Sequence, residues 1–264
     1  MKRLVLALVV LLATPSVFAG ATYKFRSVTT GTASQTIAGV MKLEGGKMRM
    51  ELTSGDGTLF TDGAVVISGD GGKTLNVTDP ATKTFYQLDL TDLLGGASAI
   101  TKQFGDLVKF DVRNPQVNVT NAGSVGNVEG FPAQRSTVDS AYDLVVTAMG
   151  QDMTIKMKNA TEVWWTDKVP AEFANVLQQR GIRTGIEAVD KIVAAQTSSI
   201  KGFPIKQVTT TTVTLNGREM KTTTTSNVSE YKQATFAADQ FVIPAGYTKV
   251  ENPIEKMMGK LGSR

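Results

Sequence analysis

Apolar and polar residues alternate one by one along much of this chain. Between Lys47 and Leu52 three charged residues alternate with three apolar ones, and the segment from Met153 to Lys158 repeats the pattern. Successive side chains of a β-strand point to opposite faces, so alternation is typical of a strand with one buried and one solvated face. Strands of a parallel sheet are covered on both faces and are continuously apolar. The sequence therefore predicts a mostly β protein built on an antiparallel sheet.

The same pattern, bounded by Gly, Asn and Asp, predicts where the strands lie. We expect them at 46–52, 64–67, 84–90, 108–112, 144–148, 153–158, 161–165, 208–215, 221–228 and 241–243. Asn216-Gly217 is the clearest hairpin signal, because both residues tolerate the positive φ of a type I′ turn. Gly150-Gln151 is expected to close another hairpin.

Runs of threonine at 209–212 and 222–225 lie symmetrically about Asn216-Gly217. Residues that are β-branched and carry a hydroxyl suit a pleated surface with a solvated face, so we expect the two runs to pair. A flat threonine array that binds ice or a polysaccharide would need the repeat over many strands. Two runs favour ordinary strand pairing.

Helical periodicity is confined to three segments. From 170 to 196 apolar residues recur every three or four positions, with Pro170 suited to the first turn. Gly181 and Gly185 divide this segment into two helices or one kinked helix. The other helices are expected near 92–105 and 253–261. Each segment has a single apolar face, which we expect to cover one side of the sheet.

The N-terminal segment predicts export. Lys2 and Arg3 precede an apolar run that is too short to span a bilayer. Val17 and Ala19 place small residues before a cleavage point at Gly20, so we predict a signal peptide at 1–19 and a periplasmic or secreted mature protein. Loss of Lys2 and Arg3 lowers the formal net charge from +4 to +2. No later stretch is apolar enough to cross a membrane.

The chain contains no Cys and no His. This excludes Ser-His-Asp and Cys-His nucleophile systems, structural zinc sites, thiol redox chemistry and haem attachment. An exported chain without cysteine is typical of a bacterial cell envelope rather than of disulfide-braced animal proteins. The small net charge gives no basic field for nucleic acid. We expect no cofactor, no metal and no nucleic-acid partner.

Two short segments echo each other. Residues 128–134 read Val-Glu-Gly-Phe-Pro-Ala-Gln and residues 200–206 read Ile-Lys-Gly-Phe-Pro-Ile-Lys. Proline is tolerated at the start of a strand, so both copies are expected to begin equivalent strands of one curved sheet. No Pro-rich or Ser-rich linker interrupts 20–264, which predicts a single domain.

Several segments together resemble a domain-of-unknown-function family of exported bacterial proteins. They are the Gly46–Glu51 strand, the Asp62-Gly63 strand, the Asp79–Leu88 strand with Phe85-Tyr86, the Gly-Phe-Pro segments and the closing Phe241–Tyr247. That family looks related to the periplasmic lipoprotein carriers LolA and LolB. The resemblance implies a curved antiparallel half-barrel with helices covering its concave face around an apolar cavity. Unlike LolB, this chain has no Cys for lipid attachment.

Methionine favours a binding function. Only Met1 of the ten methionines lies within the predicted signal peptide, and this unbranched, polarizable side chain adapts to irregular apolar ligands. Together with the carrier-like resemblance, this predicts a non-enzymatic protein that binds a lipid or a lipoprotein acyl chain. The candidate lining residues are Met48, Met50, Met153, Ile155, Met157, Trp164, Ile186 and Val189. Ordinary core packing is the alternative role for these residues.

Two other functions are compatible with the sequence. The first is an envelope interaction or assembly module, whose concave face is filled by its own helix and which binds another protein. The second is a carbohydrate-active enzyme, because two carboxylates suffice for glycoside chemistry without His. Its candidate acids are Asp139, Asp143, Glu162 and Asp167. Trp164 and Trp165 are adjacent on a predicted strand, so at most one of them can line a given sugar site.

Overall fold

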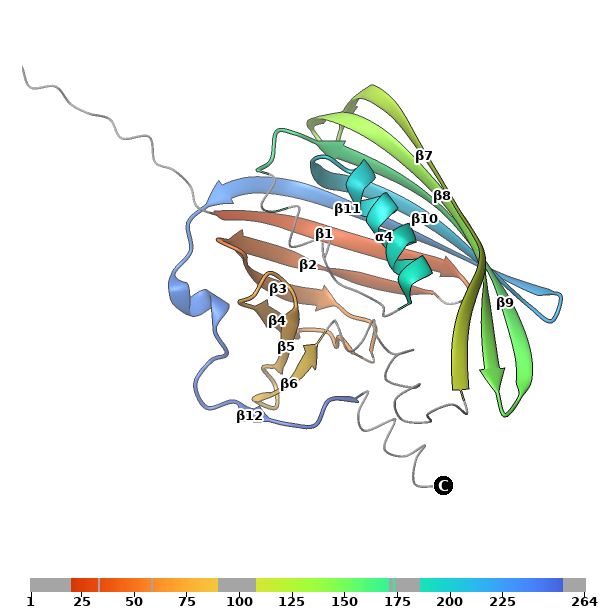
Figure 1. Cartoon of the computed structure of the whole chain (residues 1–264). Coiled ribbons are helices and arrows are strands. Elements are labelled where there is room, and N and C mark those ends of the chain that lie inside the picture. Colours follow the sequence, from red (N-terminus) through yellow and green to blue (C-terminus); the bar gives the residue numbers. More distant parts are fainter. Residues whose placement is uncertain are drawn as a thin grey trace, which may run out of the picture.

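The structure is a computed structural model that describes residues 20–32, 34–57, 59–89, 108–170, 173 and 186–253. Its strands form one open, curved, twelve-stranded sheet (Figure 1). The order across the sheet is β12-β6-β5-β4-β3-β2-β1-β11-β10-β9-β8-β7. All neighbours are antiparallel except β12 and β6. The predicted mostly β, antiparallel architecture is confirmed.

The strands differ greatly in length. Their bounds are β1 Gly20–Gly31, β2 Gln35–Glu44, β3 Lys47–Ser54, β4 Val65–Ser68, β5 Thr74–Asp79, β6 Thr84–Asp89, β7 Val108–Val128, β8 Phe131–Ala148, β9 Gln151–Thr166, β10 Phe203–Leu215, β11 Arg218–Ala234 and β12 Thr248–Lys249. β1 joins the two halves of the chain, because it pairs with β2 on one side and with β11 on the other.

The hairpin of β10 and β11 has the predicted form. Asn216 and Gly217 adopt positive φ values of 51° and 78° at its turn. The threonine runs pair directly, with Thr209 opposite Thr224. The turn between β8 and β9 lies at Met149 and Gly150, one residue before the expected position.

Other strand predictions need correction. The expected strands at 153–158 and 161–165 are parts of one strand, β9, and β7 and β8 extend far beyond 108–112 and 144–148. β1, β2 and β5 are absent from the expected set. The expected strand at 241–243 is wrong, because Phe241 ends a 3-10 helix, η2 (Ala238–Phe241), where its ring packs against Phe236. Both Gly-Phe-Pro segments begin strands, as predicted.

One face of the sheet is apolar from β1 to β6. Directly opposed residues form a row across these strands: Tyr23, Met41, Met50, Val66, Val77 and Tyr86. The ring of Tyr23 meets that of Phe203 edge-on at 5.4 Å between centroids. Val169 and Phe173 belong to the same buried cluster. This face, on which the described helix also packs, is called the helix face below.

Hydroxyl groups replace apolar side chains in the middle of the helix face. Two neighbouring rows of opposed residues are Thr29, Thr224, Thr209, Thr161 and Val138, and Ser27, Ser226, Gln207, Val163 and Ser136. Hydroxyl pairs join adjacent strands, with Oγ1 to Oγ1 distances of 3.0 Å for Thr29 and Thr224 and 3.2 Å for Thr161 and Thr209. The helix face therefore changes along its strands from an apolar region to a region of neutral polar side chains.

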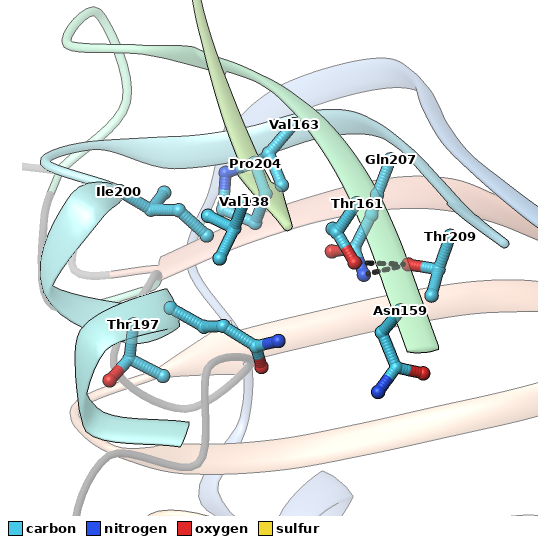
Figure 2. A pocket seen from close by; sticks show the side chains of 10 residues that line it. Val138, Asn159, Thr161, Val163, Thr197, Ile200, Pro204, Gln207 and Thr209 are labelled. Carbon is cyan, nitrogen blue, oxygen red and sulfur yellow. Dashed lines mark hydrogen bonds between the residues drawn. The ribbon is translucent and has the colours of Figure 1, made fainter. Parts of the chain in front are cut away.

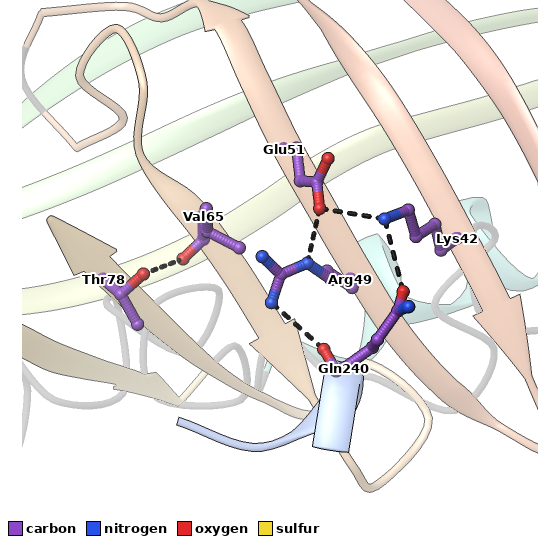
Figure 3. Close-up of polar contacts among 6 residues, drawn as sticks. All are labelled: Lys42, Arg49, Glu51, Val65, Thr78 and Gln240. Carbon is purple, nitrogen blue, oxygen red and sulfur yellow. Dashed lines mark hydrogen bonds and ion pairs between the residues drawn. The ribbon is translucent and has the colours of Figure 1, made fainter. Parts of the chain in front are cut away.

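The opposite face of the sheet carries charges. Glu51 accepts from Lys42 Nζ at 3.0 Å and from Arg49 Nε at 2.6 Å (Figure 3). Both cations also reach Gln240 of η2, which fastens that 3-10 helix to β2 and β3. Partial burial raises the pKa of Glu51, but the hydrogen bonds and charges of Arg49 and Lys42 outweigh it and the net pKa is lowered.

The described helix, α4 (Glu187–Ser199), packs against β7 and β8. It continues three residues beyond the expected end of the 170–196 helix. The signal peptide 1–19, the helix at 92–105, residues 171–172 and 174–185, and nearly all of 253–261 lie outside the described residues. Coverage of the concave face by several helices thus stays a prediction. No helix in the described part is long and apolar enough to cross a membrane.

A contact between distant strands shows the curvature. Glu129 lies in the turn between β7 and β8, and its carboxylate accepts a 3.0 Å hydrogen bond from Nδ2 of Asn227 on β11. β9 and β10 lie between β8 and β11 in the sheet order. The ring centroid of Phe131 on β8 is also only 5.7 Å from that of Tyr231 on β11. The sheet bends until strands that are not neighbours touch.

Candidate ligand-binding pocket

A pocket of about 380 Å³ lies where the end of α4 meets the hydroxyl rows of the helix face. We call it the helix pocket (Figure 2). Strands β8, β9 and β10 supply one side, and the last turn of α4 with the following Ile200 supplies the other. Its lining residues are Val138, Asn159, Thr161, Val163, Gln196, Thr197, Ile200, Pro204, Gln207 and Thr209.

The lining divides into an apolar and a polar part. Val138, Val163, Ile200 and Pro204 are apolar, and Figure 2 shows them together near the end of α4. Thr161, Thr209 and Gln207 form a hydrogen-bonded group, since Gln207 Nε2 donates to Thr209 Oγ1 at 3.1 Å. Such a pocket can hold a molecule with an apolar body and a polar end.

Among the residues that the structure describes, none that lines the helix pocket is charged. Two charged residues next to them in sequence do not line the pocket and have contacts of their own. Lys206, which precedes Gln207, places Nζ 5.0 Å from the ring centroid of Trp164. Glu162, which follows Thr161, pairs with Arg135 at 3.4 Å. The pocket therefore lies on a neutral part of a chain that carries many charges.

Buried contacts hold α4 at the edge of the pocket. Ser136 Oγ lies 3.2 Å from the carbonyl oxygen of Ser199 and accepts a hydrogen bond from Trp165 Nε1. Val163, Trp165 and Ile200 form a small buried cluster beside these groups. Because β8, β9 and the end of α4 share these contacts, the position of the helix relative to the sheet is fixed at this end.

The other side of α4 borders a second hollow, of about 630 Å³. Phe110, Val112 and Val117 of β7 face Ile186 and Ile192 across it. Its rim is charged: Glu187 and Lys191 pair at 2.7 Å, and this contact lowers the pKa of Glu187. The sheet supplies only β7 residues to this hollow, so it is more open than the helix pocket.

The structure distributes the sequence-predicted lining residues over several places. Met48 is buried in the main apolar cluster, and Met50 packs against that cluster. Ile186 lines the second hollow, and Val189 lies in the first half of α4. Trp164 also packs against the main cluster, and its ring centroid lies 5.0 Å from Lys206 Nζ. These residues do not come together as one lining.

Met153, Ile155 and Met157 share the helix face of β9, beyond the helix pocket. Met157 is opposite Val213 and Tyr142, and Ile155 is opposite Leu215 and Leu144. Met153 is 42% exposed. The far ends of the long strands thus continue the helix face as a half-exposed apolar surface.

The four candidate acids of the enzyme alternative have different surroundings. Glu162 contacts Arg135, and Asp167 contacts the neighbouring Lys168 at 3.4 Å. Asp143 accepts a hydrogen bond from Asn114 Nδ2 at 2.8 Å, while Asp139 is exposed. Within the described ranges, no three acidic residues gather as metal ligands would.

The neutral polar residues of the helix pocket are missing from the sequence prediction. Thr209 belongs to a threonine run for which the sequence predicts strand pairing. Asn159, Thr161 and Gln207 occupy inward positions of β9 and β10. Thr161 and Asn159 lie two and four residues before Val163, which places them on the face of that buried residue, and Gln207 lies opposite Val163 on β10.

Comparison with known proteins gives limited similarity. No family model matches the chain, and no curated protein matches its sequence. Among solved structures, PNGF-II is similar with a TM-score of 0.35 and 11% identity over 90% of this chain. A LolA superfamily protein from Nitrosomonas europaea is similar with a TM-score of 0.32 and 10% identity, over 86% of this chain and 91% of that one. This chain spans 32% of the length of PNGF-II.

Proposed function

We propose that this chain is a non-enzymatic protein of a bacterial periplasm that binds an apolar or amphipathic ligand, with the acyl chain in the helix pocket. The observation that carries the proposal is a pocket of about 380 Å³ with an apolar part, a neutral polar part and no charged lining residue. This volume lies in the range of sites for small molecules.

The apolar part of the lining can supply the affinity. Each methylene group of an acyl chain that leaves water contributes up to about 0.8 kcal/mol, before the costs of association are subtracted. Val138 and Val163 are almost fully buried and fixed in the sheet, so they are already ordered for contact with a ligand. Within the described part of the chain, no acid, base or nucleophile beyond threonine hydroxyls lines the pocket, which supports binding rather than catalysis.

The periplasmic location rests on the sequence. The basic start, the short apolar run and the small residues before Gly20 support export. The lack of cysteine supports a bacterial envelope.

Native mass spectrometry tests the proposal. The full chain is produced with its own leader in a Gram-negative host and purified from the periplasm without detergent. We expect an adduct of lipid mass, which organic extraction recovers. A clean mass that stays unchanged after incubation with envelope lipids would overturn the proposal and favour a protein-interaction module. Retention of the whole chain in the cytoplasm would overturn the location.

Two matched variants locate the adduct. Gln196→Trp places a large side chain into the helix pocket from the last turn of α4. Ser198→Trp adds the same side chain to the same turn at an exposed residue that does not line the pocket. We expect Gln196→Trp to lose the adduct and Ser198→Trp to keep it, with both variants folded by circular dichroism. Equal adducts in both variants would place the ligand elsewhere.

A further inference from the structure

The polar end of the helix pocket differs from a site for anions. Its hydrogen-bonding side chains are Asn159, Thr161, Gln196, Gln207 and Thr209, all of them neutral. An ionised carboxylate or phosphate that leaves water needs a cation or several strong donors in return. Among the described residues that line the pocket, none is Lys or Arg.

The direction of α4 adds a second argument against an anion. Gln196 and Thr197, in its last turn, line the pocket. The C-terminal end of a helix carries a partial negative charge, and no basic residue lies in the last turn to offset it. Serine and threonine hydroxyls there donate back to helix carbonyls, as Ser199 does to Gln196, so they do not point toward a ligand as donors.

Lysines that are close to lining residues in the sequence do not supply a positive charge to the pocket. Lys158 adjoins Asn159 and belongs to the opposite side of the sheet. Lys206 adjoins Gln207, does not line the pocket, and places Nζ 5.0 Å from the ring centroid of Trp164. A carboxylate in the helix pocket would therefore meet neutral side chains and the negative end of a helix.

We propose that the helix pocket selects a neutral, hydroxyl-bearing acyl compound of the acylglycerol class over a fatty acid or an alkyl phosphate with the same chain. The proposal rests on the proposed function and names its ligand class. A ligand hydroxyl can donate to the amide oxygens of Asn159 or Gln207 and accept from the threonine hydroxyls. An ester carbonyl can accept from the same donors without carrying a charge into the pocket.

Calorimetry with three probes of equal chain length tests the selection. Monolaurin, laurate and dodecyl phosphate are titrated into the full periplasmic chain at pH 7.5, each below the concentration at which it aggregates. We expect monolaurin to bind at least tenfold more tightly than either anion. If the anions bind as tightly as monolaurin or more tightly, the selection is overturned while the binding function stands. If none of the three binds, the proposed function itself is overturned.

A charge introduced into the pocket provides the decisive variant. Gln207→Lys places a cation in the lining, and we expect it to raise the affinity for laurate at least tenfold and to remove the preference for monolaurin. Gln116→Lys adds the same charge at an exposed residue of β7 outside the helix pocket and should keep the original preference. An equal gain for laurate in both variants would show a general charge effect and overturn the assignment to this pocket.

Discussion

Trp165 Nε1 donates a 3.0 Å hydrogen bond to Oγ of Ser136. The same hydroxyl lies 2.8 Å from Oδ1 of Asn121 and 3.2 Å from the carbonyl oxygen of Ser199. A serine hydroxyl has one proton, so it donates to one of these two acceptors at a time while it accepts from the indole. One buried hydroxyl thus links β7, β8, β9 and the last residue of α4.

Ser136→Ala leaves the buried indole N–H of Trp165 without this acceptor. We expect the free energy of unfolding to fall by about 1–3 kcal/mol, the cost of an unsatisfied buried donor. Urea denaturation followed by circular dichroism measures the change. In a Trp165→Phe background the same serine substitution should cost less, because the N–H is already gone. An equal cost in both backgrounds would show that the pair is not coupled.

Alternation predicted some of the strands whose inward positions are apolar, although β2 and β5, with Met41 and Val77 facing inward, were missed. β3 and the Met153–Lys158 part of β9 follow this pattern. β1 does so only in part, because its inward residues change from Tyr23 and Phe25 to Ser27 and Thr29. A strand whose two faces are both polar has no period-two hydrophobic signal. In β1 the hydroxyl residues of the polar part thus weaken the strand signal, whereas the threonine strands β10 and β11 were found from their β-branched residues and the Asn216-Gly217 turn.

The two Gly-Phe-Pro segments were predicted correctly as strand starts, but their glycines serve different purposes. Gly130 adopts a φ of +84° in the turn before β8, which L-residues rarely adopt. Gly202 has ordinary φ, but a Cβ there would lie 2.3 Å from the carbonyl oxygen of Thr166. The glycine of one copy thus permits a turn, and the glycine of the other permits two strands to approach closely.

The candidate site could not be predicted from the sequence. Methionine spacing identified apolar strand faces, and Met48 entered the main core because β3 lies within the fully apolar region. The helix pocket instead combines two β9–β10 rows with the end of α4, which the chain brings together only through the sheet order. Neutral polar residues give no distinct signal before that order is known.

The pKa of Glu51 predicts an acid-dependent contribution to stability. Its pKa is lower in the folded chain than the unfolded value of about 4.3. The contribution is therefore present above pH 4.3 and is lost as the pH falls through the folded pKa. We expect Glu51→Gln to lower the urea midpoint at pH 7 and to lower it less as the pH falls through the folded pKa of Glu51. The pair with Lys42 is partly exposed, so the effect at pH 7 should stay below about 1 kcal/mol.

High salt is the control for Glu51. Raising the salt concentration at pH 7 should narrow the difference in urea midpoint between the parent chain and Glu51→Gln, because salt screens partly exposed charges. A difference in urea midpoint that does not shrink as the solution is acidified would show that Glu51 contributes through packing rather than through its charge.

Tyr23 has a buried hydroxyl with no hydrogen-bond partner among the described residues. Tyr23→Phe removes this unsatisfied group and keeps the ring contact with Phe203. We expect the free energy of unfolding at pH 7 to stay unchanged or to rise by up to about 1 kcal/mol. Thermal and urea unfolding measure it. A loss above about 1 kcal/mol would show that the hydroxyl has a partner.

Alkaline pH gives an independent test of Tyr23. Burial raises the pKa of its hydroxyl far above the ordinary value. The unfolded chain then loses this proton near pH 10 while the folded chain keeps it, so stability falls as the pH rises above 10. We expect Tyr23→Phe to lose less stability than the parent chain between pH 9 and pH 11. Parallel curves would contradict the buried state of the hydroxyl.

The β8–β9 turn places a methionine where asparagine is usual. Met149 has a φ of 52° and is 87% exposed, whereas Asn216 has a φ of 51° at the same position of the β10–β11 turn. Left-handed backbone costs most L-residues about 1–2 kcal/mol, and asparagine less. We expect Met149→Asn to raise the free energy of unfolding by about 0.5–1 kcal/mol and Asn216→Met to lower it by a similar amount. Urea unfolding of both variants checks the opposite signs. Destabilisation by Met149→Asn would show that the exposed methionine makes a stabilising contact.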